Sequence, residues 1–194
     1  MKESIKFGFI LLLFCAISAG LLSLVNSFTA PVIAETQLKE TLKSYEEIFG
    51  EEVESFEELD SDTLDKVKEA HPNIAKVFIA QKEGKTIGYG INVFSNGFGG
   101  QMENAIGFLN EGDRIAGFRN ISHQETKGFG SKIEEPDYYN SYEDKNAAGE
   151  LECNTNPDAD NQIMLLSGAT VSSEAVLVGA NEAVEAFQML KAME

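Results

Sequence analysis

Residues 75–94 read AKVFIAQKEGKTIGYGINVF. Two apolar stretches, 75–81 and 86–94, are rich in β-branched and aromatic residues and flank the tripeptide Glu83-Gly84-Lys85. Such a composition favours strands, and a glycine between two strands favours a tight connection. The segment therefore predicts a β-hairpin.

Two more strands are expected directly after this hairpin. Residues 102–109 and 114–122 are again apolar and β-rich, and the sequence Asn110-Glu111-Gly112-Asp113 joins them. Asn, Gly and Asp are the residues that tight turns prefer. Together with the hairpin, these segments predict an antiparallel sheet of at least four strands.

The segments on either side of the predicted sheet are polar. Residues 51–65 are dense in acid and predict a solvated surface segment with a short helix into Ala70. Residues 131–161 predict an irregular surface excursion with a short helix near 134–142. Cys153 lies in that excursion, where a lone accessible thiol is the expected state.

A longer helix is predicted at the end of the chain, from about Ser172 to Met193. Ser172, Ser173 and Glu174 supply capping chemistry at its start. Helical spacing places the following apolar residues on one face: Val176, Ala180, Ala183, Val184, Phe187 and Leu190. Helices of this kind beside an antiparallel sheet define an α+β fold class.

The N-terminal part has a different character. Residues 7–34, FGFILLLFCAISAGLLSLVNSFTAPVIA, contain no charged side chain. As a helix, residues 7–28 would extend about 33 Å at ~1.5 Å per residue, enough for a bilayer core. Pro31 predicts a break, after which residues 33–49 have the periodicity of an amphipathic helix.

The alternative for this segment is a cleaved signal peptide. Its apolar run is longer than the roughly 7–15 residues of a signal peptide's hydrophobic region, which favours a retained anchor. The predicted organisation is an anchor segment, residues 1–33, followed by one domain, residues 34–194. Two lysines precede the span and two follow closely, so the lysine count leaves the orientation open.

The charge of the chain excludes several classes of partner. The total is −17, and the first 33 residues carry +1, so the rest carries −18. Nucleic acids bind to basic patches, so the acidic domain argues against nucleic acid as a partner. Two cysteines without a Cys-x-x-Cys pair argue against a disulfide scaffold, a zinc site or an iron–sulfur cluster.

The strongest local candidate for a binding site is SGATVSS, residues 167–173, where an apolar run meets the last helix. Small residues allow close approach of a ligand, and free N–H groups at a helix start attract anions. A domain this acidic would need such local help to hold a phosphate. The alternative is an ordinary helix cap.

Two glycine-containing loops are further candidates. HQETKGFG, residues 123–130, follows a predicted strand, and residues 97–100 read GFGG. The stretch 97–100 lacks the spacing of a dinucleotide-binding or P-loop motif, which excludes a nucleotide site of that kind. On spacing alone, a plain strand-ending loop is the favoured interpretation of residues 123–130.

Taken together, these motifs resemble one family. SGATVSS resembles the S-G-A-T signature of domains to which FMN is joined covalently, and HQETKGFG resembles their H-x-E-T-P-G-L-G loop. The glycine-rich stretch 97–100, followed by a strand, falls in the expected place. LLSLVNSFTAPVI, residues 21–33, is similar to the anchor of the G subunit of the Rnf ion-translocating electron-transport complex. The resemblance covers nearly the whole chain.

The resemblance implies a definite site. Thr170 would carry FMN through a phosphoester, installed from FAD by a separate Mg-dependent flavin transferase. The ester phosphate would lie near Ser167, Gly168, Ala169 and Ser172. The loop residues Glu125, Thr126 and Gly128 would lie along the isoalloxazine ring, and no metal site is implied.

The resemblance also implies a role and a location. The domain would lie on the extracytoplasmic side of the cytoplasmic membrane and relay electrons, with no substrate site of its own. Other membrane and peripheral Rnf subunits would be its partners, and the complex would couple ferredoxin:NAD⁺ electron transfer to Na⁺ or H⁺ movement. The alternatives are the C-type component of the Na⁺-translocating NADH:quinone oxidoreductase, and a non-flavin assembly or sensor module.

Two residues depart from the family pattern. Met164 stands three positions before Ser167, where the family often has an acidic residue, and Lys127 replaces the usual proline of the loop. Met164 bears on the efficiency of flavin attachment. Lys127 bears on the stiffness of the loop and on the charge near the flavin.

Overall fold

The computed structural model describes residues 2–193. Two compact units divide these residues, the first ending at Glu40 and the second spanning Thr41–Glu194. The first unit belongs to one long helix, α1, Lys2–Phe49, whose last turns, from Thr41 onward, are part of the second unit. The predicted boundary at residues 33 and 34 stays a prediction.

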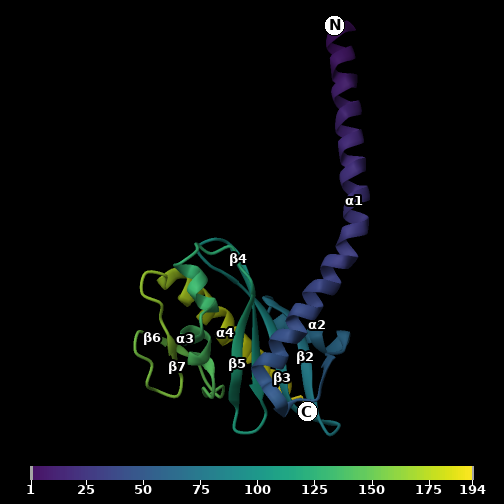
Figure 1. Ribbon diagram of the computed structural model, residues 1–194. Coiled ribbons are helices and arrows are strands. Elements are labelled where there is room, and N and C mark those ends of the chain that lie inside the picture. The colour runs from purple at the N-terminus through teal and green to yellow at the C-terminus, as the bar shows by residue number, and fades with distance from the viewer. Residues whose placement is uncertain (1, 194) are drawn as a thin grey trace. The chain divides into compact units, whose positions relative to one another are not determined.

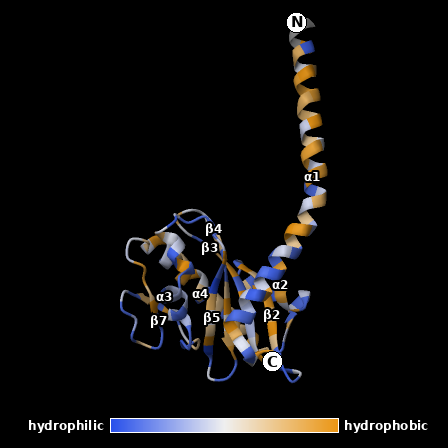
Figure 2. Cartoon of the chain, viewed as in Figure 1, coloured by the Kyte–Doolittle hydropathy of each residue, from blue (hydrophilic) through white to orange (hydrophobic). Residues whose placement is uncertain are grey.

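Helix α1 continues through Pro31, so the predicted break there is wrong. A proline removes one backbone donor, and the apolar turns on both sides keep their own hydrogen bonds. One helix of the described chain, Ile5–Phe49 within α1, is long and apolar enough to cross a membrane. Figure 2 shows its apolar residues in orange, and large side chains such as Phe7, Phe14 and Leu22 are exposed.

The second unit contains a five-stranded antiparallel sheet in which each strand pairs with its neighbour in sequence (Figure 1). Its strands are β1, Ser55–Glu58; β2, Ile74–Lys82; β3, Lys85–Asn96; β4, Gln101–Leu109; and β5, Arg114–Ser122. The four predicted strands are confirmed within one or two residues at each end. The α+β class is confirmed as well.

The shorter elements complete this unit. They are η1, Gly50–Glu52; α2, Ser61–Ala70; η2, Gly130–Glu134; α3, Pro136–Tyr139; η3, Asn140–Tyr142; β6, Glu152–Asn154; and β7, Gln162–Met164. The last helix, α4, spans Thr170–Lys191. It therefore begins two residues earlier than predicted.

Helix α4 covers one face of the sheet. Phe187 is fully buried, with its ring stacked on that of Phe108 from β4 at 4.8 Å between centroids. Gly179 lies over β3, where an added Cβ would be 3.2 Å from Cβ of Ser95. The predicted apolar face of α4 thus forms the core on this side.

The end of α1, residues 41–49, packs on the opposite face of the same sheet. A row of paired glycines, Gly90, Gly107 and Gly117, makes room for it. An added Cβ at Gly90 would be 2.5 Å from the ring of Tyr45, and one at Gly107 would be 2.5 Å from Ile48. Glycine is needed here because the helix side chains lie directly on the strand backbone.

The acidic segment after α1 contains a strand that the sequence analysis did not predict. In β1, residues Ser55–Glu58 pair with Gln81–Phe78 of β2 through backbone hydrogen bonds, and their side chains are mostly exposed. Charged residues on an edge strand discourage pairing with other chains. This explains why the strand lacks an apolar alternation.

Candidate functional site

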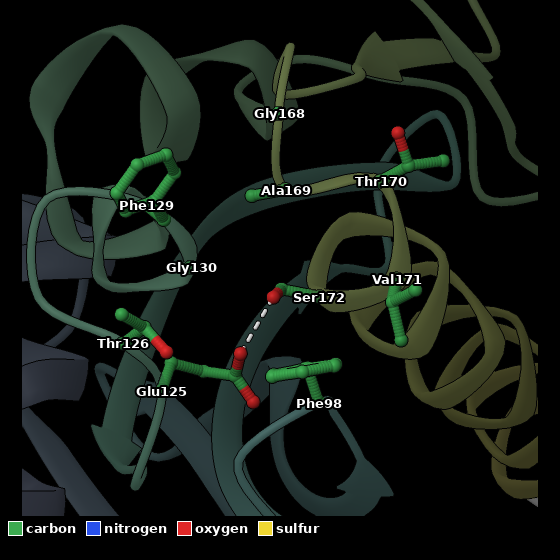
Figure 3. Close-up of a pocket in the computed structure, with 10 residues that line it drawn as sticks. All are labelled: Phe98, Glu125, Thr126, Phe129, Gly130, Gly168, Ala169, Thr170, Val171 and Ser172. Carbon is green, nitrogen blue, oxygen red and sulfur yellow. Dashed lines mark hydrogen bonds between the residues drawn. The ribbon is translucent and has the colours of Figure 1, made fainter.

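A pocket of about 460 Å³ lies at the start of α4 (Figure 3). Three segments that are far apart in the sequence form it: the glycine-rich loop 97–100, the loop 123–130 and residues 168–172. The lining residues are Phe98, Glu125, Thr126, Phe129, Gly130, Gly168, Ala169, Thr170, Val171 and Ser172. The three candidate motifs of the sequence therefore meet at one place.

Thr170 is the first residue of α4 and its side chain is exposed. Ala169 stands at the cap position, where no side chain caps the helix. The first N–H groups of a helix have no acceptor within the helix, and the helix dipole adds positive potential there. The threonine hydroxyl therefore lies beside backbone groups that favour an anion.

The predicted capping by Ser172 and Ser173 is wrong, because both side chains point into the protein. Ser172 is buried and its Oγ donates to Oε2 of Glu125 at 2.6 Å. Ser173 is fully buried and its Oγ donates to the carbonyl of Ala169 at 3.2 Å. Because α4 starts at Thr170, these serines lie inside its first turn, on the side that faces the core.

The turn before α4 depends on Gly168, which has a φ of +81°. Other residues rarely adopt this backbone conformation, so the small residue is required here. The following N–H, of Ala169, donates to the carbonyl of Leu166 at 3.1 Å and closes the turn. Ser167 is exposed but does not line the pocket.

The loop 123–130 contributes a buried carboxylate. Glu125 is only 8% exposed, and besides Ser172 it accepts a hydrogen bond from the N–H of Gly99, at 2.9 Å from Oε1. Its own N–H donates to Nδ1 of His123 at 2.9 Å. Thr126 is exposed at the pocket, whereas Gly128 does not line it.

Exposed apolar side chains surround the pocket. Phe98 is 74% exposed, Phe129 59% and Val171 53%. Large apolar groups gathered at a concave site are typical of ligand binding. Phe98 and Phe129 lie within the predicted motifs, but no role was predicted for them; an aromatic residue beside glycines in each loop was the available signal.

The lining residues include the carboxylate of Glu125 and no lysine or arginine, so the N–H groups at the start of α4 are the positively polarised groups available to an anion. Lys127 is exposed, and Met164 of β7 is half-buried against the core. Among the described residues, no group of His, Cys, Asp and Glu side chains is arranged to hold a metal ion.

Cys153 is half-buried rather than freely accessible, which corrects the expectation for it. Its Sγ is 4.0 Å from the carbonyl oxygen of Ser173. Burial raises the pKa of its thiol to about 11, and the negative charge of Glu174 contributes. The excursion that contains it folds back against α4 through β6, which pairs with β7.

Both the segment that forms the pocket and the N-terminal helix have counterparts in known protein families. The FMN-binding domain family matches residues 97–185, the segment that contains all three pocket motifs, and the RnfG N-terminal region matches residues 1–48. Fold and site together define an FMN-binding-domain protein with an N-terminal helix of membrane-spanning length. In these two segments the chain is similar to FMN-binding domains and to the N-terminal region of RnfG.

Curated relatives agree along most of the chain. The G subunit of the Na⁺-translocating ferredoxin:NAD⁺ oxidoreductase complex of Acetobacterium woodii is 26% identical over 97% of this chain and 94% of its own. The G subunit of the proton-translocating complex of Clostridium ljungdahlii is 29% identical, over 88% and 84%. The G subunit of an ion-translocating oxidoreductase complex of Shewanella oneidensis is 32% identical, over 67% and 62%.

Solved structures share the fold. The NqrC-type component of the Na⁺-translocating NADH-quinone reductase of Parabacteroides distasonis has a TM-score of 0.53 at 21% identity, covering 70% of this chain and 78% of that one. NqrC of Shewanella oneidensis has a TM-score of 0.52 at 21% identity, covering 61% of each chain.

Proposed function

We propose that this chain is a membrane-anchored electron-transfer flavoprotein that carries FMN covalently on Thr170. It would serve as the G subunit of an ion-translocating ferredoxin:NAD⁺ oxidoreductase complex. The observation that carries the proposal is the exposed hydroxyl of Thr170 at the uncapped start of α4, on the wall of the pocket. The relatives that bear the name of this subunit support the wider assignment.

The pocket fits such a group in size and chemistry. Its volume of about 460 Å³ lies in the range of small-molecule sites, roughly 300–1,000 Å³. A flat aromatic ring system can cover the exposed side chains of Phe98, Phe129 and Val171. A phosphate on Thr170 would lie at the N–H groups of the first turn of α4.

Attachment from FAD is a phosphoryl transfer whose atoms balance. Oγ1 of Thr170 would attack the phosphorus on the riboflavin side of the FAD pyrophosphate, forming the phosphoester, while AMP leaves and the hydroxyl proton passes to solvent. A separate Mg²⁺-dependent flavin transferase would catalyse this step. The exposure of Thr170 supports access by another protein.

The residues of this chain then hold and shield the cofactor. Bound FMN supplies the electron-accepting and electron-donating chemistry. Phe98 and Phe129 would exclude water from faces of the ring, and the tether on Thr170 would keep the flavin from diffusing away. We place residues 34–194 on the extracytoplasmic side of the membrane, with the remaining Rnf subunits as partners, as the family resemblance implies.

The test is a mass measurement on the peptide that contains Thr170, from full-length protein made with the transferase. We expect the mass of FMN phosphoester on this peptide, and its complete loss in Thr170→Ala. Thr126→Ala is the matched control, because it removes the other threonine of the pocket. An unmodified wild-type peptide, or loss of the flavin in Thr126→Ala but not in Thr170→Ala, would contradict the proposal.

A further inference from the structure

The carboxylate of Glu125 joins the three segments that form the pocket. Its Oε1 accepts from the N–H of Gly99 at 2.9 Å, and its Oε2 accepts from Oγ of Ser172 at 2.6 Å. Figure 3 shows the second bond, which spans from the loop 123–130 to the first turn of α4. One side chain thus connects the glycine-rich loop, its own loop and the helix that carries Thr170.

Glycines enclose this carboxylate. A Cβ added at Gly97 would overlap Oε1 of Glu125, and one added at Gly130 would overlap Oε2. With 8% of the residue exposed, the carboxylate has little contact with water. Hydrogen bonds to a charged group are stronger than neutral ones, and a dry environment strengthens them further.

The backbone of Glu125 is held as well. Its N–H donates to Nδ1 of His123, so the hydrogen bonding assigns the proton of a neutral imidazole to Nε2. That Nε2 lies 3.2 Å from Oε1 of Glu134 in η2. The backbone of Glu125 is therefore held within its own loop, independently of the bonds that its side chain makes to Gly99 and Ser172.

The residues that Glu125 fixes stand next to the walls of the pocket. Phe98 directly precedes Gly99, and Val171 directly precedes Ser172. A shift at either hydrogen bond would move an exposed apolar wall relative to Thr170. Because each carboxylate oxygen accepts a hydrogen bond from another segment that forms the pocket, the carboxylate links these segments to one another.

We propose that Glu125 is a positioning residue that sets the distance between the glycine-rich loop and the first turn of α4 through its two hydrogen bonds. This rests on the proposed function, in which the pocket receives the flavin of Thr170. In this role Glu125 holds Phe98 and Val171 where they pack against the isoalloxazine ring. The negative charge of its carboxylate is not what acts on the flavin.

Glu125→Gln separates the two roles, because glutamine keeps an oxygen for Gly99 and presents an NH₂ to Ser172 while removing the charge. Glu125→Ala removes both bonds. The matched control is Glu182→Ala: Glu182 also accepts from one backbone N–H and one side chain, those of Asn73 at 2.9 and 2.7 Å, and it does not line the pocket.

The first measurement needs no flavin. In full-length protein made without the transferase, we compare hydrogen exchange at the amide of Gly99. Wild type and Glu125→Gln should exchange similarly, and Glu125→Ala should exchange about tenfold faster, as expected for the loss of one charge-assisted hydrogen bond. Glu182→Ala should match wild type. Equal exchange in Glu125→Ala and wild type would overturn the proposal.

The second measurement uses flavin-loaded protein. Dichroism in the flavin absorption bands reports how the ring is held, and the midpoint potential reports the charge near it. We expect Glu125→Gln to retain both, and Glu125→Ala to lose most of the dichroism with FMN still on Thr170. A changed potential in Glu125→Gln with unchanged Gly99 exchange would show a charge role and overturn the positioning role.

A second variant guards against misfolding of Glu125→Ala. Ser172→Ala removes one of the two bonds and should reduce the dichroism while the Gly99 amide stays protected. Unchanged dichroism in that variant would count against the proposal. If wild type carried no flavin, the proposed function would fail, whereas the exchange result for Gly99 would still show whether Glu125 joins the two loops.

Discussion

Helix α4 presents the outer side of its first turn to solvent at the pocket, whereas the inner face of its later turns packs against the sheet. Thr170 and Val171 are exposed beside the pocket, whereas Val176, Ala180 and Phe187 are fully buried. The later turns attach the helix to the sheet, so the first turn needs no packing on its outer side. The helix thereby holds the side chain of Thr170 in a fixed place without burying it.

The largest effect on stability is expected from breaking the attached part of the helix. Phe187→Ala removes a buried ring that stacks on Phe108 and meets Tyr89 edge-on. Such substitutions cost about 3–5 kcal/mol, because the cavity adds to the lost burial. Denaturant unfolding of the full chain in detergent measures this loss.

Val178→Ala is the control on the same helix, because Val178 is 65% exposed. It should change the free energy of unfolding by less than about 0.5 kcal/mol. A loss in Phe187→Ala no larger than in Val178→Ala would mean that the later turns do not attach the helix, and the contrast between its two parts would disappear.

The reactivity of Cys153 tests whether the inner side of the first turn of α4 is closed to solvent, because its Sγ lies 4.0 Å from the carbonyl oxygen of Ser173. Burial raises the pKa of its thiol to about 11 from an ordinary value of 9.0, so at pH 8 its thiolate fraction is about a hundredfold lower. Alkylation should be slowed by a similar factor and should rise about tenfold per pH unit up to pH 11.

The measurement uses Cys15→Ser, which leaves Cys153 as the single thiol of the chain. The rate in denaturant is the internal control, since unfolding removes the burial. Equal rates in folded and denatured protein at pH 8 would show an accessible thiol, and the inner side of the first turn would then be open to solvent like its outer side.

The sequence predicted those parts of the fold that follow an apolar period. Strands β2 to β5 and the buried face of α4 were found because burial of one face requires regular spacing. Strand β1 was missed because Phe56 is the single apolar residue among its four and therefore gives no alternation, although its ring packs against Tyr45 and Phe49. The continuation of α1 through Pro31 was missed because proline was taken as a helix breaker, whereas the helical turns on both sides of it continue the helix.

The site was predictable as motifs but not as an arrangement. The sequence indicated SGATVSS and HQETKGFG separately, and the roles assigned to their residues stay predictions. Residue spacing could not show that Ser172 and Gly99 both donate to the carboxylate of Glu125. These residues are far apart in the sequence and come together only when the chain folds. The helix start moved by two residues, and with it both serines changed from caps to inward-facing groups.

The smallest change in the free energy of unfolding is expected at Thr170, on the exposed side of the first turn of α4. In the part of the chain that the structure describes, the Thr170 hydroxyl has no hydrogen-bond partner, so its loss should not weaken the apo fold. Without flavin, Thr170→Ala should change the free energy of unfolding by less than about 0.5 kcal/mol, since exposed substitutions away from packing rarely do more. Denaturant unfolding of transferase-free protein measures it. A loss above ~1 kcal/mol would mean that the first turn helps to hold the fold together, and total loss of flavin in the same variant could then no longer be attributed to the missing hydroxyl alone.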